Sequence, residues 1–291
     1  MWPDRRRKAE AALAVLALTA APATPAPIRV AVAARSVQPG ELAVFTMHTG
    51  PRVERVKLRA CERDIPVFRV GARTWRALVG IDLDVRPRGY LVAVEAESDE
   101  ATIRTTYDLR VRPRHFPTRT LVVDEAFVNP PADARDRIRQ DAETLERVWT
   151  QSAPERLWTG RFVRPVPGRS VSRFGTRSVF NGEPGRAHGG ADFRSPVGTP
   201  VEAPNNGRIV LARNLYFSGN TVIVDHGLGL FSMLAHLSTI EVAEGTLVSS
   251  GQVVGRVGAT GRVTGPHLHW AVRASGARVD PLGVLALLGK D

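Results

Sequence analysis

Four of the seven histidines lie in three short motifs in the C-terminal part of the chain. The motifs are His188-Gly-Gly-Ala-Asp192, Leu234-Ala-His236-Leu237 and Gly265-Pro-His267-Leu-His269. If His267 and His269 lie in one strand, residues two apart point to the same side, so the two imidazoles share one space. Two imidazoles make a poor core, because each ring carries a donor and an acceptor that must be satisfied when buried. The pair is better explained as half of a metal site.

A carboxylate accompanies a further histidine. His188 and Asp192 lie in a glycine-rich segment that predicts a turn leading into Phe193, so the two side chains can converge without a helix. A site of two imidazoles and one carboxylate leaves a fourth position for water, which is the pattern of catalytic rather than structural zinc. A structural site would more often use several cysteines, and the chain has one, Cys61. Zinc lowers the pKa of bound water to about 7 and polarises a carbonyl oxygen, so an amide can be attacked at neutral pH.

The segments around these motifs predict a mostly antiparallel β domain. Apolar stretches between glycine-rich turns indicate strands at 201, 207–212, 221–225 and 253–257. The glycines from Gly255 to Gly265 are interpreted as tight turns rather than a phosphate loop, because no Gly-Lys-Ser or Gly-Lys-Thr follows. Asn181-Gly182 is a hairpin-turn signal.

The first half of the chain carries a separate strand pattern. Six short segments rich in β-branched, aliphatic and aromatic residues, separated by turns such as Gln38-Pro-Gly40, predict an Ig-like β-sandwich over 27–114. The segments are 28–34, 42–48, 53–59, 75–83, 90–96 and 102–111. Residues 115–161 predict a helical connector, because from Ala132 onward residues such as Ile138, Leu145 and Trp149 form one apolar helix face.

The N-terminus has the layout of a secretory signal peptide, residues 1–26. Basic residues up to Lys8 precede a mainly apolar stretch and then small residues, which predicts cleavage between Ala21 and Ala26. The apolar stretch has only about half the ~20 residues that a bilayer-spanning helix needs, so no stable membrane span is expected after cleavage. Export to the periplasm or the extracellular cell envelope agrees with the single cysteine, which we expect to be a buried small hydrophobe.

The formal net charge of +11 comes almost entirely from arginine, because only Lys8, Lys57 and Lys290 are lysines. The arginines are scattered and no nucleic-acid module signature accompanies them, so no nucleic-acid partner is expected. The charge can still help to retain the protein near an anionic envelope.

Taken together, the motifs between Phe162 and Leu285 resemble those of the LytM/lysostaphin-type zinc metallopeptidases, which cleave peptide bonds of peptidoglycan. The resemblance rests on Ser172-Arg-Phe-Gly-Thr-Arg177, Phe180-Asn-Gly182, His188-x-Gly190-x-Asp192, Pro200 to Gly207, Ser218-Gly-Asn220, Asp225-His-Gly227, Ala235-His-Leu237 and Gly258-Ala-Thr-Gly261 through His269-Trp270.

The resemblance implies a peptidase domain over 162–291 that binds one Zn²⁺ through His188, Asp192 and His269. It also implies that His236 and His267 flank the bound water and the scissile carbonyl, and it leaves open which of them acts as base. The family often has tyrosine at the position of Leu234, which predicts the loss of a groove contact here.

The sequence therefore predicts a mainly β, secreted zinc metalloendopeptidase that hydrolyses peptide crosslinks of peptidoglycan, with direct D,D-type crosslinks favoured over glycine bridges. The alternative is a non-catalytic peptidoglycan-binding regulator of a partner wall hydrolase, although such relatives typically lack metal ligands that this chain retains. A third interpretation is intramolecular inhibition, in which the N-terminal sandwich or the connector helix lies over the groove. The single histidines His48, His115 and His226 are interpreted as structural.

Overall fold

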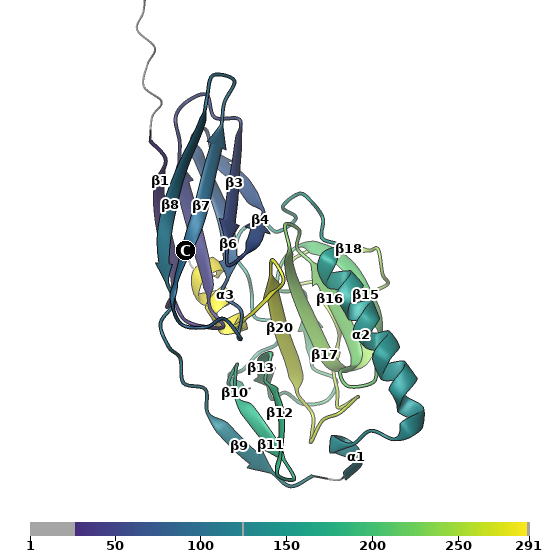
Figure 1. Ribbon diagram of the computed structural model, residues 1–291. Coiled ribbons are helices and arrows are strands. Elements are labelled where there is room, and N and C mark those ends of the chain that lie inside the picture. Colours follow the sequence, from purple (N-terminus) through teal and green to yellow (C-terminus); the bar gives the residue numbers. More distant parts are fainter. Residues whose placement is uncertain (1–26, 124, 290–291) are drawn as a thin grey trace, which may run out of the picture.

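The chain is mainly β and consists of two β-rich parts that lie end to side (Figure 1). The computed structural model describes residues 27–123 and 125–289, so the predicted signal peptide, 1–26, lies outside the described residues. No helix within the described ranges is both long and apolar enough to cross a bilayer.

Two four-stranded antiparallel sheets, ordered β1-β2-β6-β5 and β4-β3-β7-β8, form the predicted N-terminal sandwich. The strands are β1 (Arg29–Ala34), β2 (Leu42–His48), β3 (Arg55–Ala60), β4 (Arg63–Ile65), β5 (Val67–Gly71), β6 (Thr74–Gly80), β7 (Gly89–Glu97) and β8 (Thr102–Arg110). Burial alternates along β3, where Val56, Leu58 and Ala60 face the core between the sheets. The short strands β4 and β5 were not predicted.

Cys61 lies in the turn between β3 and β4, so the expectation that it is buried in the core is wrong. Cys61 and Glu62 have φ of 48° and 65°. Positive φ at both central residues is the geometry of a type I′ two-residue hairpin turn, which matches the twist of its strands. The turn therefore holds the thiol half-buried at the surface end of the strands.

The connector contains the predicted helix and one unpredicted strand. It runs through β9 (Thr118–Leu121), α1 (Glu125–Val128), the 3-10 turn Ala132–Ala134 and α2 (Arg135–Thr150). β9 pairs in parallel with β11 and so joins the small sheet β12-β11-β9. The domain boundaries expected at 26, 114 and 161 stay predictions.

The C-terminal part is built on a ten-stranded sheet whose main path is β10-β13-β20-β17-β16-β15-β18. Its elements, with those of the small sheet, are β10 (Ser170–Ser172), β11 (Arg177–Phe180), β12 (Glu183–Ala187), β13 (Gly190–Phe193), β14 (Pro200–Glu202), β15 (Gly207–Leu215), β16 (Gly219–Asp225), β17 (Leu230–Ile240), β18 (Leu247–Val248), β19 (Val253–Val257), β20 (Leu268–Ala274), β21 (Ala277–Val279) and the final helix α3 (Pro281–Leu288). Asp280 caps α3 by accepting a hydrogen bond from the Leu282 amide, and Pro281 occupies the first turn.

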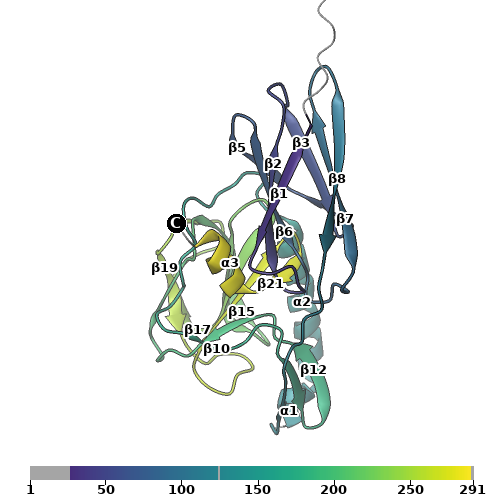
Figure 2. The same ribbon diagram turned by 90° about the vertical axis from the view of Figure 1, so that its left-hand side faces the viewer.

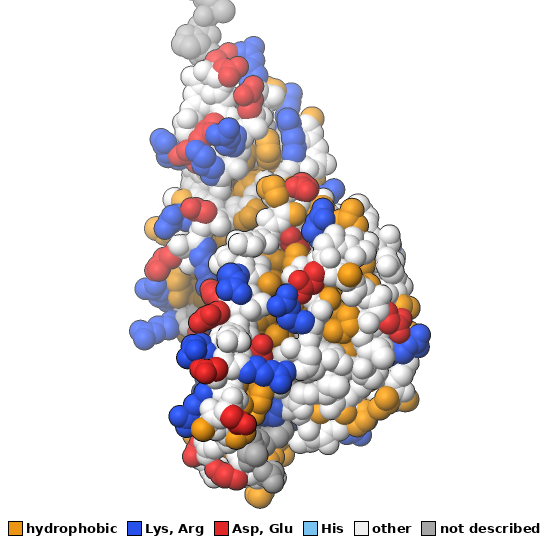
Figure 3. Space-filling view, turned by 90° about the vertical axis from the view of Figure 1, so that its right-hand side faces the viewer, with side chains coloured by type: hydrophobic (Ala, Val, Ile, Leu, Met, Phe, Trp, Pro, Cys, Tyr) orange, Lys and Arg blue, Asp and Glu red, His pale blue; other side chains and the backbone are white. Residues whose placement is uncertain are grey.

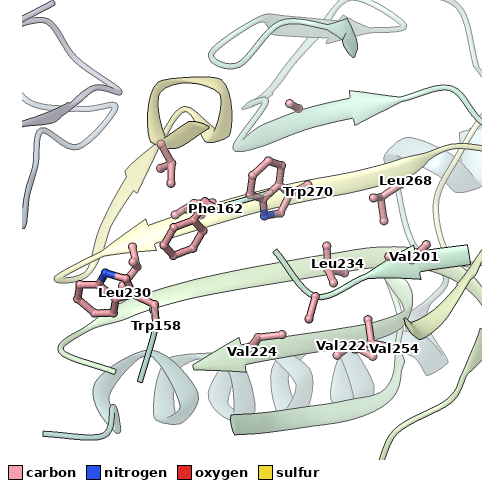
Figure 4. Close-up of a cluster of buried hydrophobic side chains, with 14 of the residues drawn as sticks. Trp158, Phe162, Val201, Val222, Val224, Leu230, Leu234, Val254, Leu268 and Trp270 are labelled. Atoms are coloured by element: carbon pink, nitrogen blue, oxygen red, sulfur yellow. The ribbon is translucent and has the colours of Figure 1, made fainter. Parts of the chain in front are cut away.

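The two faces of the large sheet have different coverings. Leu268 and Trp270 of β20 point to a core on one face, which also holds Leu234 (Figure 4). His269 and Arg273 belong to the opposite face, because side chains alternate along a strand. On that opposite face α2 packs its apolar side chains on strands β15, β16 and β17. The residues in this cluster are Leu145, Val148, Trp149, Val210, Leu211, Leu215, Ile223, Phe231 and Met233.

The sandwich is fixed to the C-terminal part by ion pairs that join distant parts of the sequence. Arg278 of β21 donates to Asp82 through its backbone N–H at 2.8 Å and through Nη2 at 2.6 Å. Arg35 donates to both Glu41 and Asp280, at 2.6 and 2.5 Å. β21 and α3 thus lie against β6 and β2 at one end of the sandwich (Figure 2).

Charged side chains of both signs are interspersed over the face shown in Figure 3, with no large area of one sign. Basic and acidic side chains often lie next to each other on this face (Figure 3), and exposed pairs such as Arg104–Glu95 and Arg213–Glu244 have the same arrangement. The view agrees with the scattered arginine pattern of the sequence.

Candidate metal centre

Two adjacent strands place the three predicted metal ligands together. Asp192 of β13 lies directly opposite His269 of β20 in the antiparallel register. His188 precedes β13, and its backbone N–H donates to the Thr176 carbonyl at 2.9 Å. The segment 190–193 is a strand rather than the predicted turn, because it is hydrogen-bonded between β10 and β20 and this pairing overrides the freedom of its glycine.

The three donor atoms converge on one point. His188 Nε2 lies 2.9 Å from Asp192 Oδ1, His269 Nδ1 lies 2.9 Å from the same oxygen, and the two nitrogens are 3.1 Å apart. Donor atoms bound to one tetrahedral zinc ion lie about 3.3–3.6 Å apart, given metal–ligand distances of about 2.0–2.2 Å. Small outward shifts of the side chains would therefore admit an ion, and the set of two imidazoles and one carboxylate suits zinc.

A backbone carbonyl next to His188 determines which nitrogen of the ring is free to bind a metal. Its Nδ1 lies 3.2 Å from the Arg173 carbonyl oxygen. A carbonyl oxygen only accepts, so Nδ1 carries the proton and Nε2 keeps its lone pair for a metal. Arg173 was not identified from the sequence as a partner, because a backbone carbonyl leaves no signal in the residue type.

Asp192 is held as a carboxylate. Burial alone would raise the pKa of its carboxyl, but the adjacent imidazoles of His188 and His269 outweigh burial and hold the pKa well below its usual range. The anionic form that a metal requires is thus present at neutral pH. Burial also lowers the pKa of His269, which favours the neutral ring that can bind a metal.

The two other predicted site histidines lie beside the cluster. The His236 ring centroid is 4.9 Å from that of His267 and 5.9 Å from that of His269. His236 Nδ1 donates to the Thr260 carbonyl at 2.9 Å, and His267 Nδ1 donates to the Gly265 carbonyl at 2.8 Å. In the neutral form each ring therefore retains a lone pair on Nε2. The Nε2 of His267 is 3.8 Å from Asp192 Oδ1.

The backbone of His236 is in the left-handed region, with φ of 64°. It lies where the pairing of β16 with β17 shifts register, between the pairs Asn220–Leu237 and Val222–Leu234. A bulge of this kind re-aims one side chain, and a non-glycine residue keeps positive φ only when its surroundings impose it. Here the His236 N–H donates to the Ser218 carbonyl at 2.9 Å. Burial chiefly, and then the neighbouring His269, lower the pKa of His236 to about 3.

All five residues line one open groove with a volume of about 1090 Å³. Exposed apolar side chains lie along it, with exposed fractions of 92% for Val122, 60% for Val171 and 60% for Val197. Besides Asp192, its charged side chains are three arginines, Arg119, Arg194 and Arg262. No residue of α2 is among the lining residues, whereas Arg119 and the segment 121–123 of the connector are.

Several residues outside the metal cluster, which the sequence analysis also singled out, have structural contacts. His226 is fully buried and is bonded to the Asn206 carbonyl and Ser232 Oγ, while His48 contacts Thr74 in the sandwich. Asn181 and Gly182 have φ of 51° and 89°, so they form the predicted hairpin turn, and the Asn181 side chain also bonds the backbone of Val123. Leu234 lies in the core and supplies no groove contact.

Comparisons with known proteins match the same region. A family model described as peptidase family M23 matches residues 186–281, which include all five site residues. Peptidoglycan DD-endopeptidase ShyA of Vibrio cholerae is 44% identical over 95 residues, which cover 33% of this chain and 22% of that protein. DD-carboxypeptidase/endopeptidase Mpg of Neisseria meningitidis is 44% identical over 99 residues, which cover 34% of this chain and 23% of that protein. The match thus spans less than a quarter of the length of these curated relatives.

A solved structure matches nearly the whole fold. A crystal structure from Pseudomonas aeruginosa, named for peptidase M23, is 31% identical with a TM-score of 0.68. The similarity covers 86% of this chain and 96% of the other.

Proposed function

Since this chain belongs to peptidase family M23, we propose that it is a zinc endopeptidase that hydrolyses peptide crosslinks of peptidoglycan in the cell envelope. The observation that carries the proposal is the convergence of His188, Asp192 and His269 on one point, with two further imidazoles beside it. The names of the matched relatives support the substrate class.

The metal would be held by His188 Nε2, Asp192 Oδ1 and His269 Nδ1. When bound, zinc supplies a Lewis acid that polarises a carbonyl oxygen and lowers the pKa of water towards about 7. Asp192 contributes the negative charge that favours a dication in a partly buried place. The Arg173 carbonyl keeps His188 in the tautomer that can bind it.

His236 and His267 would accept a proton from water and stabilise the oxyanion that forms on the carbonyl oxygen. Hydrolysis adds the oxygen of water to the carbonyl carbon, breaks the C–N bond and delivers protons to the leaving amine. His236 donates through Nδ1 to the Thr260 carbonyl, so in the neutral ring Nε2 offers a lone pair that could accept a proton from water when the reaction begins. His267, on the same side of the cluster, can share this work by stabilising the oxyanion, and the division of roles between the two rings stays open.

The groove favours an acidic, partly apolar peptide. Arg119, Arg194 and Arg262 can attract carboxylates, and the exposed valines can contact small apolar side chains. Stem-peptide crosslinks carry free carboxylates and alanine methyl groups, whereas a glycine bridge carries neither along its length. The charge of the groove therefore supports the D,D-type crosslink as substrate.

Defined muropeptide dimers test the proposal directly. We expect the zinc-loaded full chain to cleave a D,D-crosslinked dimer into monomers, read by mass, and to act more slowly on a glycine-bridged dimer. Asp192→Ala removes the central carboxylate and should abolish cleavage, whereas Asp99→Ala, an exposed carboxylate in the sandwich, should not change it.

Zinc-loaded wild-type protein that leaves every dimer intact, yet binds the peptides, would instead favour the non-catalytic wall-binding module. Cleavage that persists in Asp192→Ala would contradict the proposed site.

A further inference from the structure

The connector helix α2 lies on the same sheet face as the metal centre. Arg273, four residues beyond His269 on β20, places its guanidinium 4.9 Å from the Trp149 ring centroid. Trp149 in turn contacts Phe231 edge-on, with centroids 5.4 Å apart. Met233 both lines the groove and packs in the cluster beneath α2. The helix is therefore a close neighbour of the groove, although it does not line it.

The N-terminal half of α2 is bonded to the β15–β16 turn, which forms part of the groove wall. Asp141 Oδ2 accepts the backbone N–H of Tyr216 at 2.7 Å. Arg137 Nη2 donates to Asn214 Oδ1 at 2.5 Å, and the same guanidinium lies 5.8 Å from the Tyr216 ring centroid. Two side chains one helical turn apart thus hold the two ends of the segment 214–216.

Two routes connect this turn to His236, and the first reaches the backbone of His236. Two residues beyond Tyr216, the Ser218 carbonyl accepts the His236 N–H at 2.9 Å. Thr221 Oγ1 donates to Ser218 Oγ at 3.0 Å, which helps to fix that residue. The Ser218 carbonyl is bonded to the residue whose φ is left-handed, so its position contributes to keeping His236 in this conformation.

The second connection reaches the ring of His236. Asn214 Nδ2 donates to Asn220 Oδ1 at 2.8 Å, and the Asn220 N–H donates to Thr260 Oγ1 at 2.9 Å. The Thr260 carbonyl then accepts from His236 Nδ1 at 2.9 Å. Thr260 Oγ1 also donates to the Leu237 carbonyl at 2.8 Å, which ties the loop to the strand that carries His236.

The turn 214–218 and the loop 259–262 pack closely through their backbones. Gly219 and Gly261 have φ of 62° and 76°, and a Cβ on either glycine would collide with the other loop. Arg262 donates its N–H to the Phe217 carbonyl at 2.8 Å and places its guanidinium 4.4 Å from the Phe217 ring. The turn 214–218 and the loop 259–262 therefore have little room to move independently of each other.

We propose that Asp141 and Arg137 of the connector helix are positioning residues for His236, acting through the turn 214–218 and the loop 259–262. The helix α2 thus supports the conformation of a proposed active-site residue and is more than a spacer between the two β-rich parts. The catalytic part of this inference rests on the proposed peptidase function, whereas the positioning part concerns only the conformation of His236.

Single substitutions on α2 test the inference in the full chain. Asp141→Ala and Arg137→Ala each remove one anchor, and the helix stays docked through Trp149 and its neighbours. The controls are Glu143→Ala and Arg139→Ala, because both residues are exposed on the same helix and neither bonds the turn. Asp141→Asn keeps an oxygen that can accept the Tyr216 N–H and should restore most of the wild-type behaviour.

Two readouts separate positioning from general destabilisation. We expect amide hydrogen exchange at His236 to rise about three- to tenfold in both anchor variants, as the loss of one net hydrogen bond implies. We expect kcat to fall about tenfold with little change in KM, because small misplacements of a catalytic group reduce the rate strongly. Both controls should match the wild type.

Unchanged exchange at His236 in Asp141→Ala and Arg137→Ala overturns the inference, whatever the activity. If the wild type cleaves no muropeptide, the exchange result alone decides the positioning role, so failure of the proposed function and failure of this inference remain distinguishable. Equal effects of the anchor and control variants would also overturn it.

Discussion

His236 combines a left-handed backbone, a buried neutral ring and a position beside three converging metal-ligand atoms. Residues held in sparsely populated backbone regions are concentrated at sites where geometry matters to function. The Ser218 and Thr260 carbonyls hold both the backbone and the ring of this residue. At the residue scale, the site is therefore defined by backbone acceptors as much as by side chains.

Replacing His236 should separate catalysis from metal binding. His236→Ala leaves His188, Asp192 and His269 in place, so we expect zinc content to stay at the wild-type value. We expect kcat to fall by about 100-fold or more, since a positioned acid–base group contributes about 10²–10⁴-fold. His48→Ala, in the sandwich, is the control. A His236→Ala protein with most of its wild-type kcat would show that this ring takes no part in the reaction.

The side chains of the site could be predicted from the sequence because their types are unusual and their motifs are short. Histidine is rare in this chain, and four of the seven histidines lie in short motifs, one of which also contains Asp192. Their supports could not be predicted, since a carbonyl of Arg173 or Thr260 is available from any residue type. The anchors Asp141 and Arg137 look like ordinary charges on a solvated helix face, and only the fold shows what they contact.

At the element scale, β21 and the loop after β6 form a bonded joint between the two β-rich parts. Asp82 accepts from the Arg278 backbone and guanidinium, and its side chain is 13% exposed. Burial alone would raise the pKa of Asp82, but the bonds from Arg278 outweigh burial, and the pKa lies below its usual value of 3.8. The charged form is therefore stabilised by folding.

Asp82→Asn should weaken this joint in a pH-dependent way. A lowered folded pKa means that the stabilisation is complete above the unfolded pKa and is lost as pH falls through the folded pKa. We expect the variant to lose about 1.5–3 kcal/mol of unfolding free energy at about pH 7, and less at about pH 3. Urea unfolding measures both values.

Asp84→Asn is the matched control, because Asp84 bonds the same arginine but is 81% exposed. Its effect should stay within about 0.5 kcal/mol. Equal losses in the two variants, or a loss in Asp82→Asn that does not shrink at low pH, would contradict this account of the joint.

The six longer sandwich strands were predicted, whereas many strands of the C-terminal part were not, for specific physical reasons. The period-two pattern is clear in β3 and β7, whereas β17 holds buried Ser232 and His236 that break the apolar signal. β9 is defined by pairing with β11, a partner distant in sequence. α3 was not predicted, although Asp280-Pro281, a capping residue followed by proline, is a helix-start signal.

At the scale of the whole molecule, the sandwich sits away from the groove lining. The groove-lining residues begin at Arg119, so within the described chain the strands β1 to β8 contribute none of them. The segment 119–123 of the connector does form part of one wall. Inhibition of the peptidase by the N-terminal part of the same chain stays a prediction. Of the described residues of that part, the segment 119–123 is the one that lines the groove and could restrict access to it.

The interface between the β-rich parts could not be read from the sequence, because its partners are far apart along the chain. Arg278 and Asp82 differ by 196 positions, and Arg35 and Asp280 by 245. The strand and turn patterns predicted the two β-rich parts, but only three-dimensional packing shows that the last strand and helix rest on the sandwich.

Metal analysis of the purified full chain shows whether His188, Asp192 and His269 bind one zinc ion. After incubation with zinc and removal of free metal, we expect about one zinc ion per wild-type chain and none per chain of His269→Ala, which leaves only two ligands. The same chains denatured in chelator give the background. Wild-type protein without zinc, or His269→Ala with as much zinc as wild type, would contradict the account.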